Sequence, residues 1–175
     1  MTNIISNADW ELAIDKSASM TNTDTPSGKS RYADVQETVG AVCRKLVELD
    51  PDGIDVSFFA TGVTHRSNVN PDKVAELFKE NECLGSTNTH LVLEAAFARH
   101  FARKADGKMK ANGTRIAVIT DGDATNRDLC AKAIVEATKL MDSDNELAVG
   151  FFQIGRDPEA TAFLGFLDDG LVEKR

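Results

Sequence analysis

The stretch Trp10–Ser19 (WELAIDKSAS) joins a short apolar run to a polar pentad in which one carboxylate and two hydroxyls alternate. Trp10–Ile14 is typical of a strand, and Asp15, Ser17 and Ser19 follow where that strand ends. Because alternate side chains of an extended chain point the same way, these three side chains can converge on one point. Oxygen ligands of this kind suit a small divalent cation. The same residue types also serve as a helix cap or a turn, so the pentad needs support from elsewhere in the chain.

Apolar runs and helical patterns alternate along nearly the whole chain. Strands are predicted over 10–14, 54–60, 114–120 and 146–154, and helices over 32–49, 71–81, 88–104, 126–141 and 158–167. The segment 62–69 is expected to form a short antiparallel edge strand, and 20–30 (MTNTDTPSGKS) a surface loop. The strands are β-branched and aromatic rather than cleanly alternating, which predicts burial on both faces. The alternation predicts the α/β class, with a mostly parallel sheet and helices on both of its faces.

Length and charge limit the classes of function. With 175 residues, the chain fits a single domain, 1–175, that can bury a substantial core. A formal net charge of -8 and a pI near 4.9 disfavour nucleic acid and anionic membranes as partners, because both bind basic surfaces. No apolar run approaches the ~20 residues of a membrane span, and the polar N-terminus lacks the features of a signal peptide. We therefore expect a soluble, cytoplasmic protein.

Two further groups of residues receive ordinary structural interpretations. The cysteines Cys43, Cys83 and Cys130 are odd in number and widely separated, in stretches that read as helical, so we expect small hydrophobic side chains rather than disulfides or zinc ligands. A basic cluster runs from Arg99 to Lys110. Cations favour the C-terminus of a helix, and this cluster is expected to be a solvated helix end.

Oxygen-bearing residues also occur at two other predicted loops. The strand over 114–120 ends in Asp121-Gly122-Asp123, and Gly85-Ser86-Thr87-Asn88-Thr89 opens the helix over 88–104. In open α/β sheets, ligands bind beyond the carboxyl ends of the strands, so these loops and the Asp15 pentad would meet if their strands are neighbours. Together they offer two carboxylates and at least three hydroxyls, a set that suits Mg²⁺. Asp123 is expected to be a turn residue, with a supporting role at the metal as the alternative.

The three motifs resemble the metal-ion-dependent adhesion site of von Willebrand factor A domains. The resemblance implies a Rossmann-like, doubly wound sheet with strand order 3-2-1-4-5 and a Mg²⁺ ion at its C-terminal edge, with Mn²⁺ or Ca²⁺ as alternatives. It implies direct metal contacts from Ser17 and Ser19, contacts from Asp15 and Asp121 that are direct or through water, and a contact from Thr87, for which Thr89 is the fallback. The remaining coordination position would be filled by an Asp or Glu of a protein partner.

The sequence departs from the family pattern in two places. Ala18 stands where many members have glycine, which matters only if the backbone there needs a positive φ. The chain stops at Arg175, where most members add a further strand. The strand over 146–154 would then be an unpaired edge, unless the tail 171–174 or a partner covers it. This edge is expected to be a docking or dimer surface, or else the chain is truncated.

The favoured function is a non-catalytic, metal-dependent protein-binding module. The predicted metal has no clear general base or activated nucleophile beside it, and His65, His90 and His100 lack metal-ligand spacing. The alternative is a metal-dependent phosphoryl hydrolase that uses Asp15 as its nucleophile. Against it, Ser17 stands where haloacid-dehalogenase-like phosphatases carry a second Asp. A metal with a purely structural role is the third interpretation.

Overall fold

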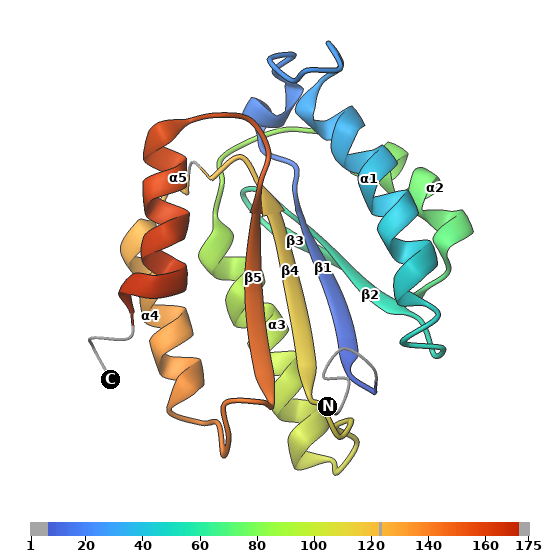
Figure 1. Ribbon diagram of the computed structural model, residues 1–175, viewed down its shortest axis with the longest axis vertical. Coiled ribbons are helices and arrows are strands. Elements are labelled where there is room, and N and C mark those ends of the chain that lie inside the picture. The colour runs from blue at the N-terminus through green and yellow to red at the C-terminus, as the bar shows by residue number, and fades with distance from the viewer. Residues whose placement is uncertain (1–6, 123, 172–175) are drawn as a thin grey trace.

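A computed structural model describes residues 7–122 and 124–171, which form one sheet with helices on both of its faces (Figure 1). In chain order the elements are β1 (Asp9–Asp15), a 3-10 turn (Ala18–Thr21), α1 (Arg31–Leu46), β2 (Ile54–Phe59), β3 (Val63–Val69), a second 3-10 turn (Pro71–Lys73), α2 (Val74–Glu80), α3 (Thr89–Ala105), β4 (Thr114–Thr120), α4 (Arg127–Thr138), β5 (Leu147–Gln153), α5 (Pro158–Gly165) and a π-helical turn (Phe166–Gly170). Every predicted strand and helix is present; the strand over 114–120 has the predicted ends, and the other elements have shifted ones.

The strand order is β3-β2-β1-β4-β5, which confirms the order that the family resemblance implies. Only β3 runs antiparallel, paired with β2, as predicted for the segment 62–69. In the parallel part, Ile14 of β1 lies opposite Phe58 of β2 and Ile119 of β4. This register places the end of β1 beside the end of β4. The loops that follow these two strands therefore start side by side.

Two apolar layers hold the helices to the sheet. Leu12 and Ile14 of β1 pack with residues of α1 and α2, whereas Ala13, which points to the other face, packs with α3, α4 and α5. Both faces of β1 and β2 are buried, as predicted. The prediction of two buried faces is wrong for β5, where Phe152 is exposed. This strand lies at the edge of the sheet and, within the described residues, pairs only with β4.

Several helix boundaries differ from the predicted ones for local reasons. The expected helix over 71–81 is split, because Asn70 caps the backbone N–H of Asp72 and starts a separate 3-10 turn. The helix predicted to end at residue 167 changes to π-helical geometry after Gly165. In the loop over 20–30, Met20 is buried within the first 3-10 turn, while most of the following residues are exposed.

The prediction of a solvated helix end is wrong for most of the basic cluster, although Lys108 is exposed. Arg99 forms an ion pair with Glu11 of β1, which is fully buried, and Arg103 pairs with Asp55 of β2 at 3.1 Å. Lys110 pairs with Asp50. The ends of these long side chains thus hold α3 and the segment after it to carboxylates of β1, of β2 and of the loop before β2. The sequence shows no sign of this, because it does not reveal which carboxylates of the strands face α3.

The cysteines behave as small apolar residues, as predicted. Cys43 in α1 and Cys130 in α4 are buried and Cys83 is half-buried, all with free thiols. Cys83 lies in the loop after α2 rather than in a helix.

No helix within the described residues is long and apolar enough to cross a membrane. Residues 172–174 of the tail that could cover the edge of β5 lie outside the described residues.

Candidate metal centre

The loop between β1 and α1 that begins after Asp15 (the Asp15 loop) and the loop between α2 and α3 that contains Thr87 (the Thr87 loop) are joined through their backbones. The N–H of Leu84 donates to the carbonyl of Lys16 at 2.8 Å, and the N–H of Ala18 donates to the carbonyl of Gly85 at 3.1 Å. Gly85 has a φ of +87°, and a Cβ at this position would collide with Thr61 Oγ1, so the close approach requires glycine. These two bonds fix the loop after α2 against the loop after β1.

The Thr87 loop is joined in turn to the loop after β4. The N–H of Thr87 donates to Thr125 Oγ1 at 3.1 Å, and the N–H of Thr125 donates to the carbonyl of Thr87 at 2.9 Å. The structure therefore brings together the three loops that contain the predicted metal ligands. They meet beyond the carboxyl ends of β1 and β4 (Figure 1), where the order of the strands reverses.

Asp15 is a fully buried carboxylate at this edge. Its Oδ1 accepts a hydrogen bond from the N–H of Ser17 at 2.7 Å, and its Oδ2 accepts one from Thr120 Oγ1 at 2.6 Å. Burial raises the pKa of Asp15 to about 6, and the charge of Asp121 adds to the increase, although both hydrogen bonds oppose it. Two neutral donors thus stabilise the ionised carboxylate only partly. A cation close to Asp15 would stabilise it further.

Ser17 and Ser19 place two hydroxyls side by side. Their Oγ atoms lie 3.0 Å apart, and Ser17 is buried. Ser17 has an extended backbone and directly precedes the 3-10 turn Ala18–Thr21, in which Ser19 is the second residue. The two hydroxyls therefore meet across the start of this turn and not along the extended chain that the sequence predicted. Within the described residues, Asn7 and Asn68 are the only non-glycine residues with positive φ. Ala18 therefore does not occupy a conformation that favours glycine, and this departure from the family pattern introduces no strain.

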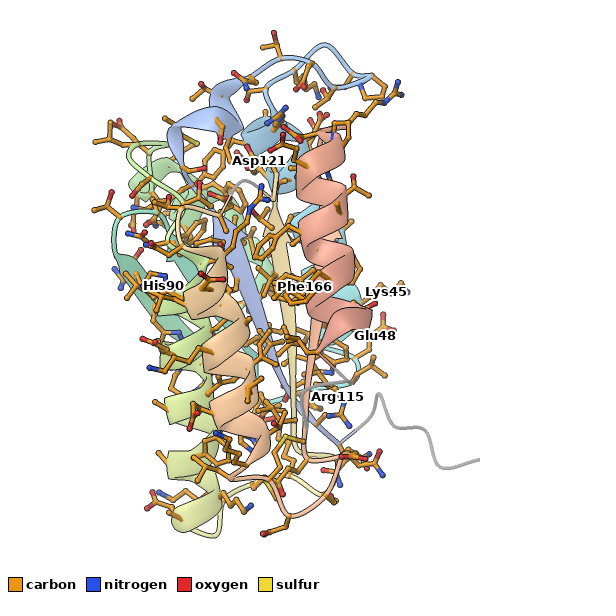
Figure 2. All side chains as sticks on the ribbon, turned by 90° about the vertical axis from the view of Figure 1, so that its left-hand side faces the viewer. Lys45, Glu48, His90, Arg115, Asp121 and Phe166 are labelled. Carbon is orange, nitrogen blue, oxygen red and sulfur yellow. The ribbon has the colours of Figure 1, made fainter. Side chains whose placement is uncertain are left out.

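Asp121 is the second buried carboxylate, with 2% of its surface exposed. Figure 2 shows it at the end of the molecule where the loop before α1 lies. Its Oδ2 accepts a hydrogen bond from Arg31 Nη1 at 2.8 Å, whereas its Oδ1 is buried and has no hydrogen-bond partner among the described residues. An unpaired buried carboxylate oxygen is costly, and such atoms are rare in folded proteins. A cation is the kind of partner that this oxygen lacks.

The remaining candidates lie nearby or elsewhere. Thr87 is buried within its loop, and Thr89 is the first residue of α3 and also buried. Asp123 falls outside the described residues. His65 of β3 bonds to Ser57 of β2, and His100 of α3 bonds to Thr114 of β4, so neither joins the three loops.

The donor set is poor in carboxylates. Within residues 7–122 and 124–171, no group of three or more His, Cys, Asp or Glu side chains could hold a metal ion. The three loops offer two carboxylates and several hydroxyls, so they do not form a group of that type. All these donors are hard oxygen atoms, which suits Mg²⁺ or Mn²⁺ rather than zinc.

Sequence reasoning missed Arg31, the buried partner of Asp121. Arg31 is the first residue of α1, where the helix dipole disfavours a cation. An arginine at the first position of a helix is a signal in the sequence, because it needs nearby carboxylates to offset the unfavourable helix dipole. This signal could have identified Arg31. Asp24, in the loop before α1, is its second partner.

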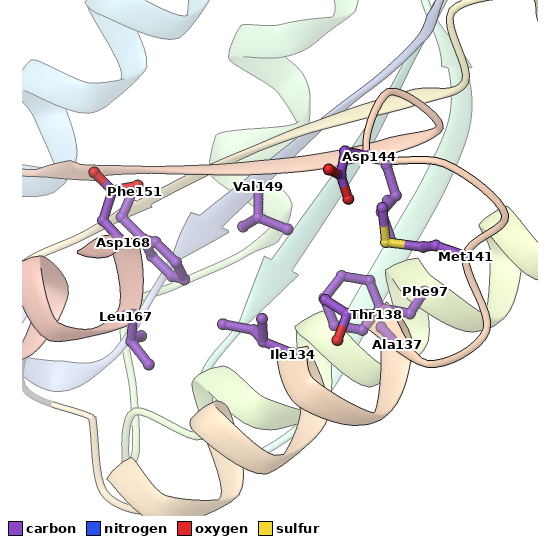
Figure 3. A pocket seen from close by; sticks show the side chains of 11 residues that line it. Phe97, Ile134, Ala137, Thr138, Met141, Asp144, Val149, Phe151, Leu167 and Asp168 are labelled. Atoms are coloured by element: carbon purple, nitrogen blue, oxygen red, sulfur yellow. The ribbon is translucent and has the colours of Figure 1, made fainter. Parts of the chain in front are cut away.

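Two cavities of the molecule have linings that include neither Asp15 nor Asp121. One cavity of about 160 Å³ lies among α4, β5 and the turn after α5 (Figure 3); its lining includes Phe97, Ile134, Met141, Val149, Phe151 and Leu167. Thr138, Asp144 and Asp168 add polar atoms to this lining, and the volume is smaller than that of typical ligand pockets. A more open hollow of about 540 Å³ borders the Asp15 loop and is lined in part by Lys16, Val63 and Leu84. Leu84 is 76% exposed at its rim.

Fold and site together define the class of protein: an α/β domain with an oxygen-rich candidate site where the strand order of its parallel sheet reverses. The family model for the von Willebrand factor type A domain matches residues 12–124, more than half of the chain. The chain therefore belongs to this family. Its domains generally mediate metal-dependent protein interactions and are typically non-enzymatic. The match covers most of β1, all of β4, and the five candidate ligands Asp15, Ser17, Ser19, Thr87 and Asp121.

Solved structures with the same fold have low sequence identity. BatB, a conserved hypothetical protein of Bacteroides thetaiotaomicron, is 20% identical, with a TM-score of 0.54 over 87% of this chain and 68% of that one. The manganese-loaded TRAP protein of Plasmodium vivax is 17% identical, with a TM-score of 0.62 over 93% and 63%. A mutant of the minor pilin PilB of Streptococcus sanguinis is 11% identical, with a TM-score of 0.59 over 97% and 61%.

At these identities the likeness concerns the fold alone. The chain spans about two thirds of the length of these neighbours. No curated protein matches the chain significantly.

Proposed function

We propose that this chain is a non-catalytic protein-binding module that captures an acidic side chain of a protein partner through a bound Mg²⁺ ion. The proposed metal ligands are Asp15, Ser17, Ser19, Thr87 and Asp121. Mg²⁺ favours about six oxygen ligands, so five side chains leave a position for the partner's Asp or Glu. Mn²⁺ and Ca²⁺ are alternatives, and the manganese-loaded TRAP neighbour is consistent with a divalent ion in this fold.

The observation that carries the proposal is the unpaired Oδ1 of Asp121, buried close to a second buried carboxylate, Asp15. Two such groups at one sheet edge oppose each other's ionisation unless positive charge is present. Arg31 supplies one positive charge but contacts only Oδ2 of Asp121. A divalent cation among the three loops would stabilise both carboxylates.

The surface beside the proposed metal suits a protein partner. The hollow next to the Asp15 loop combines the exposed Leu84 with Lys16 and Lys79, and with two acidic residues. An exposed apolar side chain beside a metal gives a partner an apolar contact next to its carboxylate. Among the described residues β5 pairs on one side only, and its other edge is a second proposed contact, where a partner or a second copy of the chain could add a strand.

The hydrolase alternative fits the geometry less well. Both oxygens of Asp15 accept short hydrogen bonds, from the N–H of Ser17 and from Thr120 Oγ1. These bonds use one lone pair of each oxygen and hold the carboxylate in place, which suits a metal ligand. The groups that donate them, a backbone N–H and a threonine hydroxyl, supply no general base for hydrolysis.

Replacing Ser17 with Ala tests the proposed function. In pull-downs from the native host, the wild-type chain is expected to retain a partner in Mg²⁺ and release it in EDTA, while Ser17→Ala retains little in either condition. The substitution removes one hydroxyl ligand with little change in volume. Ser143→Ala is the matched control, because Ser143 is exposed in the loop before β5 and should leave capture unchanged. Equal capture with and without Mg²⁺ would contradict the proposal.

A further inference from the structure

Arg31 connects two carboxylates that are distant in the sequence. Its Nη1 donates to Asp121 Oδ2 at 2.8 Å, while its Nε and Nη2 donate to the two oxygens of Asp24 at 2.8 and 2.6 Å. Arg31 is 9% exposed, and Asp24 is half-exposed in the loop before α1. A guanidinium group is suited to this arrangement, because its planar fork can hold one carboxylate with two donors and a second carboxylate with another.

The surroundings hold this guanidinium in place. The N–H of Arg31 donates to the carbonyl of Asn22 at 2.8 Å, which closes the loop before α1 onto the helix. Gly155, in the loop after β5, has a φ of +86°, and a Cβ there would lie 3.0 Å from Arg31 Nε. The guanidinium therefore lies against backbone that leaves little room for movement. Such tight packing fixes Asp121 as well.

The two oxygens of Asp121 consequently have different roles. Oδ2 is occupied by Arg31, and Oδ1 is buried without a partner among the described residues. A carboxylate that is free to rotate would present either oxygen to a cation, whereas this one is held in a single orientation. Residues that orient a metal ligand from behind typically change metal affinity by about 10–100-fold when they are replaced.

We infer that Arg31 is a positioning residue of the metal centre: it holds Asp121 through Oδ2, leaves Oδ1 as the oxygen for the metal, and through Asp24 attaches the loop before α1 to the same centre. This inference rests on the proposed function. It extends that function to the loop over 22–30, which forms one wall of the site. The position of this loop depends on the same guanidinium group that orients the ligand Asp121.

Arg31→Lys separates position from charge, because lysine keeps the positive charge but cannot span Asp24 and Asp121 together. We expect the dissociation constant for Mg²⁺, measured by isothermal titration calorimetry, to rise about tenfold in this variant. Arg99→Lys is the matched control. It alters another ion pair with a buried carboxylate, that of Glu11, and should leave the constant within about twofold of wild type because distant sites act independently.

Asp24→Asn distinguishes the ligand contact from the loop contact. It weakens the bond to the loop but leaves Arg31 on Asp121, so it should raise the dissociation constant less than Arg31→Lys does. The inference is overturned if Arg31→Lys binds Mg²⁺ as tightly as wild type, or if Asp24→Asn weakens binding as much as Arg31→Lys. A wild-type chain that binds no Mg²⁺ would instead contradict the proposed function itself. The melting temperature of each metal-free variant shows whether it is folded.

Discussion

Asp15→Asn is expected to stabilise the metal-free protein and to abolish its response to Mg²⁺. Burial raises the pKa of Asp15 from 3.8 to about 6, so the folded state binds the proton of the Asp15 carboxyl group more tightly than the unfolded state does. The stability that Asp15 contributes is therefore lost as the pH rises from about 4 to 6. At neutral pH the ionised carboxylate costs up to about 3 kcal/mol, which a neutral amide avoids. The amide can still accept from the N–H of Ser17 and donate to Thr120 Oγ1.

Thermal unfolding at pH 7.5, with Mg²⁺ or with EDTA, measures both effects. In EDTA the melting temperature of Asp15→Asn should rise by up to about 6–12 °C, the equivalent of about 3 kcal/mol in a domain of this size. Asp55→Asn is the control. Asp55 is also buried, but it pairs with Arg103, so its replacement should lower stability and preserve the response to Mg²⁺. A less stable Asp15→Asn that still responds to Mg²⁺ would contradict the account of this residue.

The affinity for Mg²⁺ is expected to fall about tenfold between pH 7.5 and pH 5. Mg²⁺ needs the ionised form of Asp15, and below a pKa of about 6 a proton competes with the metal. The expected loss is about tenfold for each pH unit below 6. Over the same range the metal-free protein should become more stable, because its folded state takes up the proton.

Calorimetric titrations at pH 7.5, 6 and 5, each in two buffers with different ionisation enthalpies, measure the affinity and the protons released. Close to one proton should be released per metal at pH 5 and almost none at pH 7.5. An affinity that is constant over this range would show that Asp15 does not contact the metal or that its pKa is not raised.

The sequence was sufficient to predict the elements of the fold because each core strand is a short apolar run between breakers. The stretch Trp10–Ile14 and the run over 114–120 are of this kind, and both form strands that end within one residue of the predicted position. Helix ends were less predictable, because local caps such as Asn70 and packing at the edge of the sheet decide them. Strand order came from the family resemblance, since the apolar runs alone do not specify neighbours.

The candidate site was predictable as three loops but not as a network of charges. Its loop residues carry a pattern along the chain, whereas Arg31 and Asp121 are 90 positions apart and their pairing depends on the packing of α1 over the sheet. The same limit explains the wrong prediction for the basic cluster. Arg99 pairs with Glu11, a carboxylate that the strand pattern alone did not place inside the protein.

The most direct test of the metal centre is the anomalous scattering of Mn²⁺ in crystals soaked with MnCl₂. The account predicts one strong peak enclosed by the Asp15, Thr87 and Asp121 loops, within about 2.5 Å of the hydroxyls of Ser17 and Ser19, given the usual length of metal–oxygen bonds. Well-diffracting crystals that show no peak there, or a peak only at another place on the protein, would contradict it.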